Sequence, residues 1–89
     1  MSKKEIIIEL KQMRNLNRRS ITNELTRKYD ILFSKLNPLE ERVMRVCYIE
    51  GKSYAICGNG IGYCERQIKR IVHRSIDKIN ELIINEREL

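Results

Sequence analysis

One stretch of this sequence decides the fold: Tyr-Cys-Glu-Arg-Gln-Ile-Lys-Arg-Ile-Val-His-Arg-Ser-Ile-Asp-Lys-Ile, residues 63–79. Its apolar side chains recur every three or four positions, which is the spacing of one face of an α-helix. These positions are Ile68, Ile71, Val72, Ile76 and Ile79. The remaining surface carries basic side chains at Arg66, Lys69, Arg70, His73 and Arg74. The pattern predicts a long helix, from Cys64 to about Asn85, with one packed face and one cationic face.

A cationic helix of this kind is a candidate for contact with a polyanion, because a single α-helix is about as wide as the major groove of DNA. The alternative is an ordinary solvated helix, since many surface helices carry basic side chains. This stretch alone supports the two interpretations equally.

The bulk composition favours a helical architecture. The chain has 89 residues, enough for one domain but too few for a large core. Hydrophobic residues make up 42% and charged residues 34%, which is typical of a globular chain and not of a disordered one. Three of the four glycines lie within residues 58–62, which marks a tight turn. We expect an all-α fold, a small helical domain of four to five helices.

Positive charge is concentrated at two places. The net charge is +6, with nine basic and four acidic side chains in residues 1–35 and five basic and two acidic ones in residues 64–78. Nucleic acid is the commonest partner for such a distribution, and an anionic membrane surface is the other. No apolar run is long enough for a membrane span or a signal peptide. We therefore expect a soluble, cytoplasmic protein with no membrane partner.

The cysteines and the single histidine do not predict a metal site or a catalytic site. Cys47, Cys57, Cys64 and His73 lack the spacing of zinc ligands, so we expect no metal and no cofactor. Cys47 and Cys57 fit better as small hydrophobic residues of the core. The sequence also has no paired carboxylates, no nucleophile beside a base and no glycine loop after a strand, so it does not predict an enzyme.

Residues 1–35 predict an N-terminal helical segment used for packing or dimerisation. A first helix is expected from Glu5 to about Leu16, and Ser20 is a suitable cap for a second helix that continues to Leu36. One long kinked helix is the alternative. The basic side chains of this segment form either a solvated face or a second phosphate-contacting surface: Arg14, Arg18, Arg19, Arg27 and Lys28.

The segment after residue 36 begins with a strong helix start. Asn37 is a favourable cap, and Pro38 fits the first helical position because its missing amide proton would have no partner there. This third helix is expected to end at Glu50 and Gly51, with Gly51 in the left-handed conformation. The predicted core of residues 36–79 comprises Leu39, Val43, Cys47, Tyr54, Cys57, Ile61, Ile68, Ile71, Val72 and Ile76.

A short glycine-containing helix follows. Ser53 is its expected cap, and it is expected to end near Asn59, with a turn made by Gly60 and Gly62. Gly58 is small enough to let another helix approach closely.

Two motifs stand at a fixed separation, Gly51-Lys52-Ser53-Tyr54 and Gly62-Tyr63-Cys64-Glu65-Arg66-Gln67. With the flanking residues they resemble the promoter-reading C-terminal region of bacterial sigma factors, and still more the small phage-encoded transcriptional regulators that use this module. The resemblance covers about residues 36–79 without insertion or deletion. It implies that residues 36–89 form a sigma region 4-like helix-turn-helix unit. Residues 1–35 do not look like the other promoter-binding regions of a full sigma factor.

The chain departs from the family pattern in the short helix and at the next cap. Glycine inside a helix costs about 0.5 to 1 kcal/mol relative to alanine, so Gly58 and Gly60 predict a short helix that is frayed or irregular. Cys64 stands where the family has serine or threonine, which forfeits a cap generally worth about 1 kcal/mol.

The resemblance implies a set of DNA-binding side chains on the long helix: Glu65, Arg66, Lys69, Arg70, His73 and Arg74. The first four are expected to face base edges or adjacent phosphates, and the last two the backbone. Arginine can donate two hydrogen bonds to guanine, and glutamate can accept one from cytosine. For Glu65 the alternative is an anion favoured at a helix N-terminus. Gln67 is expected to be solvated.

We therefore expect a sequence-specific DNA-binding transcriptional regulator, phage or prophage-derived, which reads the major groove of double-stranded DNA in a bacterial host cell with helix 64–79. The alternative is a protein-interaction module that docks on RNA polymerase or another regulator. A homodimer is also expected, because pairing would let two helices reach successive grooves about 34 Å apart. The residues expected to pair are Ile6, Ile7, Leu10 and Leu82 to Ile84.

Overall fold

The computed structural model describes residues 2–18 and 24–87, and within these ranges the chain is a small all-α domain without strands. Its elements are α1 (Lys3–Arg18), α2 (Glu24–Ser34), α3 (Pro38–Met44), the π-helical segment η1 (Arg45–Ile49), α4 (Tyr54–Ile61) and α5 (Glu65–Arg87). The predicted fold class is confirmed. Ser20, the expected cap of the second helix, lies outside the described residues.

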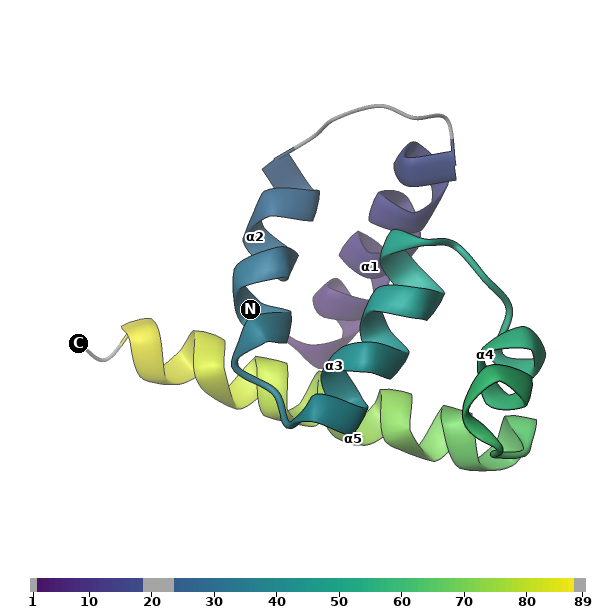
Figure 1. Ribbon diagram of the computed structural model, residues 1–89. Helices are drawn as coiled ribbons and strands as arrows, with labels where there is room; N and C mark the ends of the chain where they lie inside the picture. Colours follow the sequence, from purple (N-terminus) through teal and green to yellow (C-terminus); the bar gives the residue numbers. More distant parts are fainter. Residues whose placement is uncertain (1, 19–23, 88–89) are drawn as a thin grey trace.

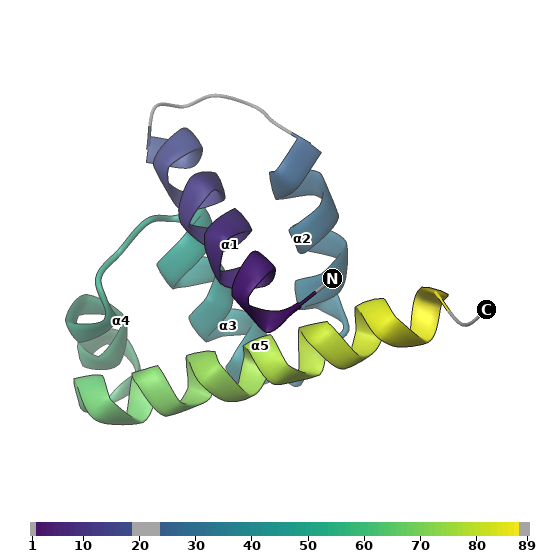
Figure 2. The same ribbon diagram turned by 180° about the vertical axis from the view of Figure 1, so that it is seen from behind.

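The long helix α5 runs along one side of the domain, and the other helices pack on it (Figure 1). Contacts join α5 to α1, α2, α3 and α4, and α1 also contacts η1. Seen from behind, α1 and α2 stand over the middle and the C-terminal part of α5 (Figure 2). The short helix α4 lies at the N-terminal end of α5, away from α2 (Figure 1).

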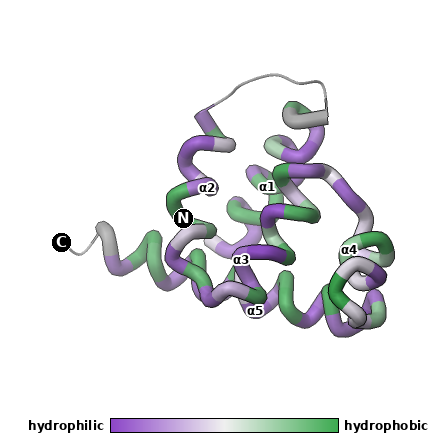
Figure 3. Tube along the Cα trace, viewed as in Figure 1, coloured by the Kyte–Doolittle hydropathy of each residue, from purple (hydrophilic) through white to green (hydrophobic). Residues whose placement is uncertain are grey.

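One hydrophobic core joins the N-terminal segment to the rest of the chain. Of the core predicted within residues 36–79, seven residues are buried and the other three, Leu39, Tyr54 and Ile61, are half-buried against it. Ile68 and Ile71 are buried, as their spacing predicts. Along α5, hydrophobic and hydrophilic residues alternate in short blocks (Figure 3), as expected for a helix with a single packed face.

The N-terminal helix packs into this core through its buried side chains. Ile6 and Leu10, two residues of the expected dimer contact, are fully buried within the single chain, whereas Ile7 is half-buried and Ile84 is 42% exposed. Ile6 and Leu10 pack into the cluster that also contains Tyr29 and Phe33. The first helix continues past the expected end at Leu16 to Arg18. The apolar end of α5 packs as expected, since Leu82 is half-buried, Ile83 is buried, and α5 contacts α1 and α2.

The third helix starts and ends where predicted, but its last turn is π-helical. The Glu40 amide donates to Asn37 Oδ1 at 2.8 Å and the Asn37 amide donates to Glu40 Oε1 at 3.4 Å, which together make a capping box. The α-helical part ends at Met44, and the helical stretch continues to Ile49 with Glu50 as its cap, at the expected end. Residues 45–49 are π-helical, and the Glu50 amide donates to the carbonyl of Arg45 at 2.9 Å. Gly51 follows with φ 73°, the predicted left-handed residue.

The short helix α4 is regular, against the expectation of fraying. Its N-terminus is capped as predicted, with the Ile56 amide donating to Ser53 Oγ at 3.2 Å. The helix continues through Gly60, which was expected in the turn, and Gly62 with φ 90° makes the turn alone. Position 58 requires glycine, because a Cβ there would collide with the carbonyl oxygen of Tyr63.

The same glycine also holds the turn through its backbone. The carbonyl of Gly58 accepts hydrogen bonds from the amides of Gly62 and Tyr63, at 2.8 and 2.9 Å. The close approach that these bonds need is open only to glycine, so this contact offsets the low helix propensity of the residue. The expected close packing at Gly58 is confirmed.

Candidate nucleic-acid interface

The start of α5 is held by a hydrogen bond that sequence reasoning missed. The backbone amide of Cys64 donates to Gln67 Oε1 at 2.9 Å, and the carbonyl of Cys64 accepts from the amide of Ile68 at 3.1 Å. Gln67 is therefore one arm of a capping box, although it was expected to be merely solvated. The signal was available in the sequence, because glutamine three residues after a cap is typical of this arrangement.

The orientation of α5 is set by its packed face. Ile68, Val72, Ile76 and Ile79 are buried in the core, and the Ser75 hydroxyl, also buried, donates to the carbonyl of Ile71 at 2.7 Å. Because these positions lie on one side of the helix, the opposite side must face solvent. The core thus determines which side chains α5 presents.

All six predicted DNA-binding residues lie on the solvent side of α5 and are exposed: Glu65, Arg66, Lys69, Arg70, His73 and Arg74. They span the first three turns of the helix. The structure therefore brings the whole predicted set onto one helical face.

The charges on this face differ in how far they are neutralised. Lys69 Nζ lies 3.8 Å from Glu65 Oε1, and both side chains are about half exposed. Arg66, Arg70 and Arg74 have no ion-pair partner anywhere in residues 2–18 and 24–87. Such a row leaves positive charge available to an anionic partner.

One basic residue of α5 is excluded from this face by its pairing. Lys78 Nζ lies 2.8 Å from Glu40 Oε1, and Glu40 is 1% exposed at the start of α3. A buried carboxylate needs such a partner, because burying an unpaired charge is costly. Lys78 is thus a packing residue, and the unpaired cationic face ends at Arg74.

Beside the arginines the surface is hollowed. A concavity of about 300 Å³ is lined by Leu39, Tyr63, Gln67, Arg70, Ile71 and Arg74. It sets one aromatic and two apolar side chains next to two unpaired guanidinium groups. Leu39 and Tyr63 were not among the predicted site residues, and the only sequence signal for Tyr63 was its place directly before the helix.

The buried thiols lie away from this face. Cys47 and Cys57 are buried and free, while Cys64 is exposed. Burial, with a smaller contribution from the neighbouring Cys57, raises the pKa of the Cys47 thiol to about 12. The thiol is therefore neutral at ordinary pH, and the two residues serve as the small hydrophobic core residues that were predicted.

None of the helices in the described ranges combines the length and the apolar character needed to cross a membrane. The described residues also hold no group of three or more His, Cys, Asp or Glu side chains placed to bind a metal ion.

Comparison with protein-family models, with curated proteins and with solved structures gives no match to this chain.

Proposed function

We propose that the chain is a sequence-specific DNA-binding transcriptional regulator that reads the major groove of duplex DNA with residues 64–79. The observation that carries the proposal is the exposed row of Arg66, Arg70 and Arg74, which lacks ion-pair partners among the described residues. Phosphate neutralisation by such side chains supplies most of the affinity of nucleic-acid-binding proteins.

The arrangement around Gly62 supports a helix-turn-helix. In this proposal α4 is the first helix of the motif, the left-handed Gly62 makes the turn, and α5 is the recognition helix that enters the groove. Arg66 and Arg70 then reach base edges, and Arg74 with His73 reaches phosphates. Glu65 and Lys69, which lie near each other on the first turn of α5, face base edges or adjacent phosphates.

The resemblance to sigma region 4-like regulators adds the biological setting to the proposal. It implies a phage or prophage origin, action in the cytoplasm of a bacterial host and RNA polymerase as a candidate partner. Homodimerisation stays part of the proposal, through surfaces other than the buried Ile6 and Leu10.

A matched pair of variants tests the proposal. One variant replaces Arg66, Arg70 and Arg74 with glutamine, and the control replaces Lys4, Lys11 and Arg27, three exposed basic residues of α1 and α2, in the same way. Both lose three positive charges. Fluorescence anisotropy on a random-sequence duplex across a salt series is expected to show affinity that falls steeply with salt for the wild type and the control. The α5 variant should lose much of that affinity, and its salt slope should be shallower by at least about one ion, because Arg74 is assigned to phosphate.

Equal losses in the two variants would attribute binding to net charge alone and would contradict a role for α5. Absence of duplex binding at low salt would leave the alternative, a protein-interaction module whose basic helix meets an acidic protein surface. That alternative predicts that the α5 variant, and not the control, loses binding to RNA polymerase.

A further inference from the structure

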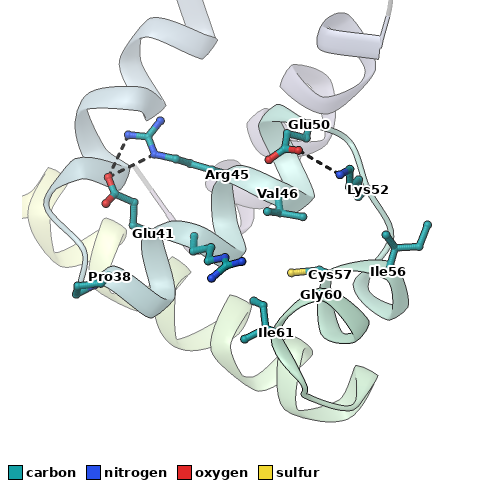
Figure 4. Close-up of a pocket in the computed structure, with 11 residues that line it drawn as sticks. Pro38, Glu41, Arg45, Val46, Glu50, Lys52, Ile56, Cys57, Gly60 and Ile61 are labelled. Atoms are coloured by element: carbon teal, nitrogen blue, oxygen red, sulfur yellow. Dashed lines mark hydrogen bonds and ion pairs between the residues drawn. The ribbon is translucent and has the colours of Figure 1, made fainter.

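A second concave surface lies between the third helix and α4. It is a groove of about 660 Å³ whose lining comes from α3, η1, the loop after it and α4 (Figure 4). Pockets of about 300 to 1,000 Å³ are typical of binding sites. None of the residues that line this groove belongs to α5, so the groove is distinct from the cationic face described above.

The floor of the groove is apolar. Val46, Cys57 and Ile61 point into the space between η1 and α4, and Ile56 stands at its edge (Figure 4). Ile56 is 56% exposed, one of the few large hydrophobic side chains left in contact with water among the described residues. An apolar surface of this kind, rimmed by polar groups, is typical of a protein-binding site.

The charged rim is almost entirely satisfied within the chain. Arg45 pairs with Glu41 at 3.1 Å and with Asp30 at 2.5 Å. Lys52 pairs with Glu50 at 3.3 Å. The remaining charged lining residue, Arg42, has no such partner within residues 2–18 and 24–87.

We infer that this groove binds an amphipathic helix of a partner protein, whose apolar side chains cover Val46, Ile56 and Ile61 and whose acidic side chain pairs with Arg42. Helices bind in grooves of this kind through apolar anchors spaced three and four residues apart. The apolar floor disfavours nucleic acid as the occupant, because phosphates and sugars would lose their water there without gaining hydrogen bonds. The inference does not depend on the proposed DNA binding.

The sequence preference of the groove can be measured directly. A displayed library of helical peptides would be selected on the full chain, with counter-selection on the Ile56→Asp variant. Because Ile56 is already largely exposed, this variant is expected to fold, and circular dichroism would verify it. We expect enriched peptides with apolar residues at i, i+3 or i+4 and i+7, flanked by Asp or Glu. Enrichment of no helical pattern, or of basic peptides, would overturn the inference.

A charge exchange then tests the role of Arg42. Arg42→Glu should weaken a selected peptide by about fivefold, as expected for one partly exposed ion pair. Replacing the acidic residue of the peptide with lysine should restore binding to this variant and weaken binding to the wild type. Ile56→Asp should weaken the same peptide by about tenfold or more.

The control is Ile31→Asp on α2, where the isoleucine is 59% exposed and does not line the groove. It should bind the peptide as the wild type does. Failure of the charge exchange to restore binding would contradict the pairing with Arg42. Displacement of the peptide by duplex DNA, or self-association that Ile56→Asp abolishes, would assign the groove to DNA or to a second copy and overturn the inference.

Discussion

The two basic regions of this chain, residues 1–35 and α5, are used differently by the fold. In the N-terminal region several basic side chains are held by other elements. Arg14 donates from α1 to the carbonyl of Gly51 at 3.2 Å, and Lys28 pairs with Glu9 at 3.2 Å while lying over the ring of Tyr29. These contacts bind elements together, so part of the N-terminal charge serves the packing of the domain.

The exposed face of α5 has no element opposite it. Arg66, Arg70 and Arg74 have no ion-pair partner within the described part of the chain, whereas Lys78, one turn beyond Arg74, reaches Glu40. The difference teaches that an excess of basic residues in a sequence does not locate a binding surface. What matters is whether the fold brings a carboxylate or a carbonyl within reach, and sequence composition does not report this.

The largest effect is expected from moving the α5 face without changing its charges. Gly58→Ala places a Cβ against the carbonyl of Tyr63, so the turn before α5 must shift. Overpacking of this kind should lower the free energy of unfolding by about 3 kcal/mol and weaken DNA binding as well. Thermal and urea unfolding would measure the free energy of unfolding, and fluorescence anisotropy would measure DNA affinity.

Gly60→Ala is the matched control in the same helix. Nothing lies within 4 Å of a Cβ built at Gly60, so the substitution should raise the free energy of unfolding by about 0.5 to 1 kcal/mol through helix propensity. DNA affinity should be unchanged. If Gly60→Ala is destabilised instead, the space around a Cβ at this position is smaller than the structure indicates.

Arg14 offers the next test, on the packing side of the comparison. Arg14→Ala removes a hydrogen bond from a charged donor to Gly51, which should lower the free energy of unfolding by about 2 kcal/mol. Lys11→Ala, an exposed residue on the same helix, should change it by less than about 0.5 kcal/mol. Measured well below its unfolding temperature, the Arg14→Ala variant should keep wild-type DNA affinity. A loss of affinity there would give the N-terminal region a direct role in binding.

For the arginines of α5 we expect the reverse: substitution should lower DNA affinity and leave the free energy of unfolding unchanged. Arg70→Ala should cost about 1 to 3 kcal/mol on the specific site and relax the preference at one or two base pairs, because a base-edge donor loses a partner only where the correct base is present. Arg74→Ala should weaken specific and random duplexes by similar factors and make the salt dependence shallower by about one ion.

Neither arginine variant should shift the unfolding curve, since both side chains are exposed. Sequence selection from a randomised duplex library, followed by anisotropy at several salt concentrations, would separate the two roles. Equal losses on every sequence for both variants, with an unchanged salt slope, would indicate that this face meets a protein.

Local chemistry accounts for what the sequence predicted correctly. Asn37, Ser53 and Gly51 act through hydrogen bonds and backbone conformations that involve residues only a few positions away, so their roles were visible in short motifs. The buried face of α5 followed from apolar spacing for the same reason. The exposed face of α5 could then be predicted as well, because it is the side of the helix opposite the buried one.

The misjudged features depend on contacts between distant parts of the chain. The π-helical turn places Tyr48 in the core, where its hydroxyl lies 2.9 Å from that of Tyr54. No local pattern specifies such a contact. Gly60 was assigned to the turn because glycine disfavours helices, but the turn is set by Gly58 and its contact with Tyr63. The groove beside α4 was not anticipated either, since its lining is drawn from α3, η1, the loop after η1 and α4.

The smallest effect is expected at His73, which tests whether the backbone-facing end of α5 meets phosphate. His73 is exposed on α5, one turn from Lys69 on one side and from Asp77 on the other, and Asp77 is engaged with Lys3 at 2.7 Å. Protonation gives an imidazole a positive charge, which can pair with phosphate. Contact with phosphate favours the charged form, so binding must take up protons and affinity must rise as pH falls. For one exposed pair the gain should be about 0.5 kcal/mol, or roughly twofold, between pH 7.5 and 5.5.

The measurement is anisotropy at constant ionic strength over that pH range, on the wild type and on His73→Gln. The glutamine variant should lose the pH dependence and bind at pH 7.5 as the wild type does. Lys3→Gln is the control for the neighbouring carboxylate, because it frees Asp77 without touching the proposed contact. A pH dependence that survives in His73→Gln would arise from other groups. It would place His73 outside the interface and leave Arg74 as the last contact on this face.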